Sequence, residues 1–166
     1  MIGTILGTAL GLAMGYLGGA FDLVISRIVE AFLALPFVII VFLFVVALGP
    51  SVAGITIIIG LVFTPLIART VRAAVQVERH QDYVSGSRLL GEGPARVMFA
   101  EILPNVMPAI VVEFTVRLGY AVFAVATLSF LGFGIQPPTP DWGADIAANY
   151  VEIGRASCRE RVCLGV

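Results

Sequence analysis

The stretch VAGITIIIGLVFTPLIA, residues 52–68, decides the fold, because it contains no charged side chain from its first residue to its last. An apolar run of about 20 residues is long enough to cross the roughly 30 Å hydrocarbon core of a membrane as a helix. Similar runs occupy residues 2–17, 31–48 and about 106–130. A cleaved signal peptide cannot account for several runs in succession. The sequence therefore predicts an all-α, polytopic bundle of transmembrane helices with about four spans.

The composition agrees with this prediction. Of the 166 residues, 59% are hydrophobic and 13% are charged, and lysine is absent. A soluble domain carries about 25% charged residues, so most of this surface is expected to avoid water. The net charge of −1 argues against a nucleic-acid partner. Both cysteines, Cys158 and Cys163, lie near the C-terminus, which indicates neither a disulfide framework nor a metal site.

The first apolar run has glycine at every fourth position, which places the glycines on one helix face (Gly3, Gly7, Gly11 and Gly15). Another backbone can approach such a face closely. This pattern favours tight packing inside the bundle, and a dedicated dimer contact is the alternative. Residues 20–30 mix charged and apolar side chains and are expected to form a short interfacial helix. Pro36 then lies inside the second run, where a kink is expected.

The positions of the arginines predict the orientation. The segment between the first two spans contains Arg27, residues 69–101 contain five arginines, and the turn at 49–51 contains none. By the positive-inside rule, 69–101 is a cytoplasmic loop. The proline-rich segment GFGIQPPTPD, residues 132–141, is then extracytoplasmic, and Trp142 is expected at the membrane interface.

The last residues, 152–166, are abruptly polar and begin EIGRASCRERVC. Back-translated, they match a common sequencing-adapter read, so we interpret them as a non-native read-through tail that follows a membrane domain at 1–151. A short basic cytoplasmic tail is the alternative, but the topology would place it outside. We also expect the native protein to extend beyond both ends of the membrane domain.

Two helices and a tight turn are predicted within the charged loop. The first covers about 81–90, with Tyr83, Val84, Leu89 and Leu90 as apolar contacts. Gly91 allows a sharp turn, and Pro94 suits the first turn of a second helix. The pair Leu103-Pro104 is expected to turn the chain into the membrane. This arrangement suits docking into a cleft on a soluble partner, although a simple connecting loop fits the periodicity too.

The last span contains two charged residues, Glu113 and Arg117, four positions apart on one helix face. Charges inside a membrane are costly and usually face a partner or a watery cavity. One interpretation is a mutual pair that lowers the cost of burial. The other is that both side chains line a translocation path.

The charged loop resembles the EAA motif of ABC-importer permeases, which reads Glu-Ala-Ala, three residues, Gly, nine residues, an apolar residue, one residue and Leu-Pro. Gly91, Leu103 and Pro104 have this spacing, but Ser85-Gly86-Ser87 replaces Glu-Ala-Ala and Glu101 takes the apolar position. The stretches ALPF at 34–37 and LSFLGFGIQPPTPDWG at 128–143 are similar to the second permease subunit of dipeptide, oligopeptide and nickel importers. The resemblance covers essentially all of residues 1–151.

This resemblance implies part of a six-span permease subunit in a bacterial or archaeal inner membrane. Its implied partners are membrane lipid, a second permease subunit, two cytoplasmic ATP-binding subunits and an extracytoplasmic solute-binding protein. The loop would be the coupling helix that contacts the ATPase. Its implied docking residues are Tyr83, Val84, Ser85, Gly86, Ser87, Leu90, Gly91, Leu103 and Pro104.

No catalytic residue, cofactor or metal is implied, since ATP hydrolysis would belong to the separate ATP-binding subunits. The missing glutamate predicts a weaker or differently anchored ATPase interface. Peptides, nickel complexes and related solutes all remain open as substrates. A secondary transporter or channel that uses Glu113 and Arg117 is the alternative function.

Overall fold

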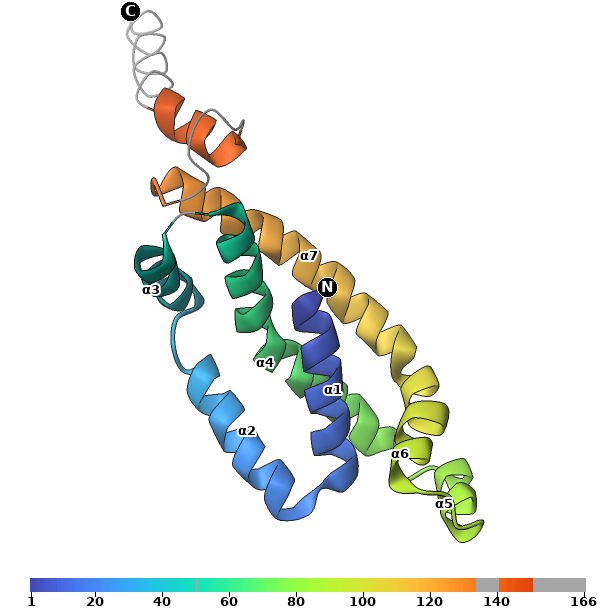
Figure 1. Ribbon diagram of the computed structural model, residues 1–166. Coiled ribbons are helices and arrows are strands. Elements are labelled where there is room, and N and C mark those ends of the chain that lie inside the picture. Colours follow the sequence, from blue (N-terminus) through green and yellow to red (C-terminus); the bar gives the residue numbers. More distant parts are fainter. Residues whose placement is uncertain (50, 134–140, 151–166) are drawn as a thin grey trace, which may run out of the picture.

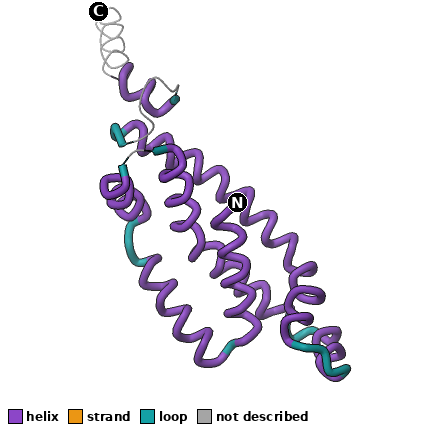
Figure 2. Tube along the Cα trace, in the orientation of Figure 1, coloured by secondary structure: helices purple, strands orange, loops and turns teal. Residues whose placement is uncertain are grey.

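The computed structural model describes residues 1–49, 51–133 and 141–150, and every regular element in these ranges is a helix (Figure 2). The elements are α1 (Ile2–Leu17), α2 (Gly19–Leu33), α3 (Phe37–Leu48), α4 (Val52–Glu78), α5 (Asp82–Leu89), α6 (Pro94–Arg96), the π-helical η1 (Val97–Ile102) and α7 (Leu103–Phe130). Residues 142–150 form a further helix. The prediction of an all-α protein is confirmed. The proline-rich segment lies mostly outside the described residues, and the predicted tail 152–166 lies wholly outside them.

α1 and α4 pack along each other at the centre of the fold and run in the same direction (Figure 1). The glycine face of α1 makes this contact. A Cβ atom at Gly7 would lie 2.7 Å from Cβ of Ile67, and one at Gly15 would lie 2.7 Å from Cβ of Val75. Side chains on these glycines would therefore push the two helices apart. The prediction of tight packing within the bundle is confirmed.

In the chain, α2 and α3 connect the end of α1 to the start of α4. Since α1 and α4 point the same way, the segment between them must return the chain to the end where α4 begins. The chain bends at Pro36 as expected, but residues 31–48 are not one kinked helix: α2 ends at Leu33, and α3 follows at a bend of 82°. Pro36 stands directly before α3 with φ −59° and ψ 124°, a conformation that cannot continue a helix. The predicted interfacial helix at 20–30 is part of the longer α2.

α4 extends further than the apolar run that predicted it. Its first turn is capped by Ser51, whose Oγ accepts a hydrogen bond from the backbone N–H of Gly54 at 3.0 Å. The helix continues through Pro65 and past the expected end at residue 68 to Glu78. Residues 69–78, predicted as the start of a helical, water-facing loop, are indeed helical, but they continue the helix of the span itself. This extension fixes the charged region rigidly to the bundle.

α6, η1 and α7 form one continuous helix over Pro94–Phe130. A second helix starting at Pro94 is confirmed, but the expected turn at Leu103-Pro104 is wrong. Pro104 cannot donate to the carbonyl four residues earlier, that of Ala100, which lies within the π-helical η1. A π-helical stretch has a different hydrogen-bond spacing, so it accommodates this interruption without ending the helix.

By length and composition, α4 and the helix Pro94–Phe130 can each cross a membrane, and the bent pair α2–α3 can form a third span. α1 is apolar but has 16 residues, which is short for a full crossing. The described residues thus give two or three spans by this measure, fewer than the four predicted. Many apolar side chains of α3 and α7 are exposed, as expected for helices that face lipid (Ile39, Leu43, Val111, Val112 and Phe123).

Candidate functional site

The short helix α5 lies at one end of the bundle, opposite the helix 142–150 (Figure 1). It ends in a well-formed cap. The backbone N–H of Gly91 donates to the carbonyl of Arg88 at 3.0 Å, and that of Glu92 donates to the carbonyl of Ser87 at 3.2 Å. This is the Schellman pattern, which requires a left-handed residue after the helix. Gly91 supplies it with φ 80°. The turn predicted at Gly91 is confirmed.

Three contacts of different kinds attach α5 to the rest of the chain. Val84 is fully buried in the core, and the Tyr83 hydroxyl donates a hydrogen bond to a carboxylate oxygen of Glu78 at 2.8 Å. Burial and this hydrogen bond raise the pKa of Tyr83, so the phenol remains a donor at neutral pH. The guanidinium of Arg88 lies over the ring of Tyr16 in α1, 5.0 Å from its centroid. α5 is therefore held in a defined orientation on α4 and α1.

The predicted docking residues separate into exposed and buried groups. Leu90 is 85% exposed, and its neighbour Leu89 is 89% exposed. Ser85, Gly91 and Pro104 are also exposed, whereas Tyr83, Gly86, Ser87 and Leu103 are partly buried. Val84 is the exception: its side chain contacts the core of its own chain, so it cannot touch a partner.

A bidentate ion pair joins α2 to α4 near the same end of the bundle. Nε of Arg72 lies 2.5 Å from one carboxylate oxygen of Asp22, and a terminal nitrogen of Arg72 lies 2.6 Å from the other. Arg79, the residue that follows α4, donates to the carbonyl of Gly15 at 3.0 Å and so joins the end of α4 to α1. The sequence did not predict either contact. An acidic residue at the start of the mixed segment 20–30 was the available signal for Asp22, but it does not identify a partner 50 positions away.

Glu113 and Arg117 form the mutual pair that was one of the two interpretations of the intramembrane charges. A terminal nitrogen of Arg117 lies 2.5 Å from a carboxylate oxygen of Glu113, and the arginine also lies over the ring of Tyr120. Both side chains are largely buried. The pairing of opposite charges on one helix face lowers the cost of placing them in a membrane segment.

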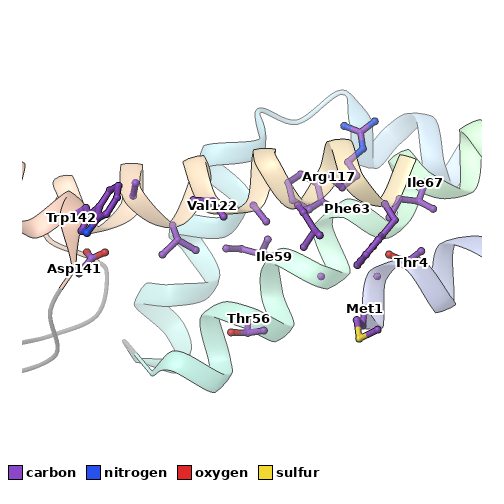
Figure 3. A pocket seen from close by; sticks show the side chains of 17 residues that line it. Met1, Thr4, Thr56, Ile59, Phe63, Ile67, Arg117, Val122, Asp141 and Trp142 are labelled. Atoms are coloured by element: carbon purple, nitrogen blue, oxygen red, sulfur yellow. The ribbon is translucent and has the colours of Figure 1, made fainter. Parts of the chain in front are cut away.

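A cavity of about 480 Å³ lies between α1, α4 and α7 and reaches Trp142 (Figure 3). Its walls are mainly apolar and include Ile59, Phe63 and Val122. Arg117 borders the cavity, but its guanidinium turns away from the labelled residues of α1 and α4 (Figure 3). The cavity thus has a mainly apolar lining with Arg117 at its edge.

Residues 7–158 match the family described as binding-protein-dependent transport system inner membrane component. The chain belongs to this family. The match covers most of the chain, including α5 and its contact residues Tyr16 and Glu78. As a member of a family of inner membrane components, with apolar helices long enough to cross a bilayer, the chain is a protein of the bacterial inner membrane.

Individual permeases are also similar to the chain. A dipeptide transport system permease protein of Haemophilus influenzae is 40% identical over 129 residues, which are 78% of this chain and 44% of that protein. A di/tripeptide transport system permease protein of Pseudomonas aeruginosa is 42% identical over 130 residues, 77% of this chain and 43% of that protein. A glutathione transport system permease protein of Shigella dysenteriae is 39% identical over 143 residues, 86% and 47% of the two chains. The chain thus spans about half the length of the curated relatives it matches.

Proposed function

We propose that the chain is part of a permease subunit of an ATP-driven importer for peptides or related small solutes. In this proposal it pairs with a second permease subunit, two cytoplasmic ATP-binding subunits and an extracytoplasmic solute-binding protein. Closure of the ATPases would drive the spans between inward-facing and outward-facing states. Membership of the family and the similarity to permeases named for dipeptides, di/tripeptides and glutathione support this assignment. None of these names refers to nickel, so peptides are the preferred substrate class.

The observation that carries the proposal is that one side of α5 is attached to the bundle while its C-terminal end is exposed. Its last residues offer Leu89 and Leu90 to solvent, while Val84, Tyr83 and Arg88 hold the other side of the helix on α4 and α1. An exposed apolar pair on a rigidly attached helix is suited to fill a pocket on a partner protein. We therefore assign α5 as the coupling helix, with Leu90 as its main docking side chain.

The departure from the family motif at Ser85-Gly86-Ser87 affects this interface. Ser85 is exposed and cannot supply the charge of the family's glutamate. Docking in this protein would therefore depend more on Leu89 and Leu90 than on a polar contact at Ser85. A weaker ATPase interface than in relatives that keep the acidic residue follows from this.

We assign Glu113 and Arg117 to the border of the translocation path, since Arg117 lines the cavity between α1, α4 and α7. The alternative function, a secondary transporter or channel, would use the same two residues. The two functions differ in energy source. Uptake into proteoliposomes that requires internal ATP supports the importer, and uptake driven by an ion gradient without ATP supports the alternative.

Co-purification of the ATP-binding subunits with the permease tests the docking role. A Leu90→Asp variant is expected to weaken their retention by at least about tenfold, because it places a charge in an apolar contact. Leu90→Met keeps an apolar side chain of similar volume and serves as the matched control. Equal retention of the ATPases by Leu90→Asp and Leu90→Met would refute the docking role of α5.

A further inference from the structure

The ion pair between Asp22 and Arg72 is the main specific contact between α2 and the rest of the bundle. α2 packs against α4 far less extensively than α1 does. Its buried residues are Asp22 and Val29, and much of its apolar surface is exposed, including Leu23 and Ile28. An aspartate that accepts two hydrogen bonds from one guanidinium fixes both distance and direction. The pair therefore determines how this part of α2 sits on α4.

The environment of the pair strengthens this constraint. The Asp22 side chain is 13% exposed and the Arg72 side chain 29% exposed, so water screens their attraction only in part. Ser26 donates a further, longer hydrogen bond to Asp22 at 3.4 Å. Arg79 also approaches from α4 and bonds the carbonyl of Gly15 in α1. Breaking a pair of this kind leaves a partly buried charge without a partner, which is strongly unfavourable.

The other end of α2 is much less constrained. An apolar cavity of about 610 Å³ lies at the bend between α2 and α3, bordered by Phe32, Pro36 and Phe44 and, from α4, by Leu61 and Pro65. The chain is not helical at 35–36, so the bend can absorb a change in backbone angle. α2 is thus fixed near its first turn and has free space around its last one.

A short rigid connection links the ion pair to α5. Arg72 and Glu78 belong to the same continuous helix α4, less than two turns apart. Glu78 accepts the hydrogen bond from Tyr83 in α5. A displacement of α5 would therefore reach Arg72 through backbone and hydrogen bonds without an intervening flexible loop.

We propose that Asp22 and Arg72 form a latch through which the docked helix α5 positions α2 and thereby the bent pair α2–α3. This inference rests on the proposed function, since α5 is assigned there as the coupling helix. The two residues are positioning residues, and they contact neither solute nor nucleotide in this scheme. Loss of the latch would leave ATP hydrolysis in place but reduce its conversion into movement of α2.

The test uses the complete importer, reconstituted with its partner permease, ATP-binding subunits and solute-binding protein. Uptake of a peptide substrate and ATP hydrolysis are measured on the same proteoliposomes for Asp22→Asn, Arg72→Gln and the charge exchange D22R/R72D. Arg27→Gln is the matched control, because Arg27 forms an exposed pair with Glu30 on the same helix. Each assay is normalised to the amount of assembled complex.

For Asp22→Asn and Arg72→Gln we expect uptake per ATP hydrolysed to fall about tenfold, within the range usual for coupling between sites. The charge exchange is expected to recover a large part of this ratio, and Arg27→Gln to leave it unchanged. A parallel fall of uptake and hydrolysis, or no change in either, would refute the latch while leaving the proposed function intact. A wild-type complex without ATP-dependent uptake would refute the proposed function itself, and the latch with it.

Discussion

Replacing Gly11 by alanine perturbs the interface between α1 and α4 at a point of very close approach. The new Cβ atom would lie 2.6 Å from the carbonyl oxygen of Ala68 and 2.8 Å from Cβ of Val71. An unstrained contact needs about 3.5 Å, so α1 must move outward by roughly 0.9 Å. Its nearest neighbour is backbone and cannot rotate away. The shift is therefore shared by the whole glycine face of α1.

The free energy of this change can be bounded from its parts. Overpacking in a well-packed interface costs about 1–3 kcal/mol. The outward shift also reduces the dispersion energy of nearby contacts, by about a quarter to a half for a gap of this size. Alanine gains about 1 kcal/mol over glycine in helix propensity, which offsets part of the loss. Gly119 lies in α7, and a Cβ atom added there would meet no atom within 4 Å, so Gly119→Ala receives the same gain without the clash.

The assay is equilibrium unfolding of the purified protein in mixed detergent micelles, with the free energy of unfolding compared between the two variants. Because the propensity term is common to both, their difference isolates the clash, expected at about 1–3 kcal/mol in favour of Gly119→Ala. A Gly11→Ala protein as stable as Gly119→Ala would refute the close packing of α1 on α4.

Three other substitutions are expected to change stability or the amount of folded protein, in directions that differ for physical reasons. Gly86→Ala should stabilise α5 by about 0.5–1 kcal/mol, since its Cβ meets nothing within 4 Å in a helical backbone, and slower amide exchange in α5 would show it. Gly91→Ala should destabilise the same helix by about 1 kcal/mol, because φ is 80° there although space is free; faster amide exchange is the readout. Glu113→Gln should lower the amount of folded protein in the membrane more than Glu113→Gln combined with Arg117→Gln, because the single variant leaves Arg117 unpaired. Equal amounts for the single and double variants would contradict the pairing.

Local signals in the sequence predicted α5 well. Tyr83, Val84 and Leu90 marked a short amphipathic helix, and Gly91 marked its end, because a left-handed cap needs glycine and is decided by neighbouring residues alone. The orientation of α5 was not predictable in the same way. Val84 and Leu90 are both apolar, and only the position of α4 beneath the helix makes one buried and the other exposed.

The three prolines of the predicted spans show where local reasoning fails. Pro65 and Pro108 lie inside continuous helices, whereas the chain breaks at Pro36. All three remove one backbone donor, so local rules treat them alike. α4 remains one continuous helix because the glycine face of α1 packs along it, beside Pro65. Pro36 lies between α2 and α3, which each pack on α4 far less extensively than α1 does, so no comparable contact holds the chain straight there.

The missing acidic residue of the family motif has a limited effect on the contacts of α5. In this chain α5 is oriented by Val84, by the hydrogen bond from Tyr83 to Glu78 and by Arg88 on Tyr16, all within one polypeptide. None of these contacts involves Ser85, which is exposed. Replacing the glutamate by serine therefore leaves the position of α5 unchanged and alters only what it offers to a partner. In this protein the strength of docking and the geometry of coupling thus depend on different residues.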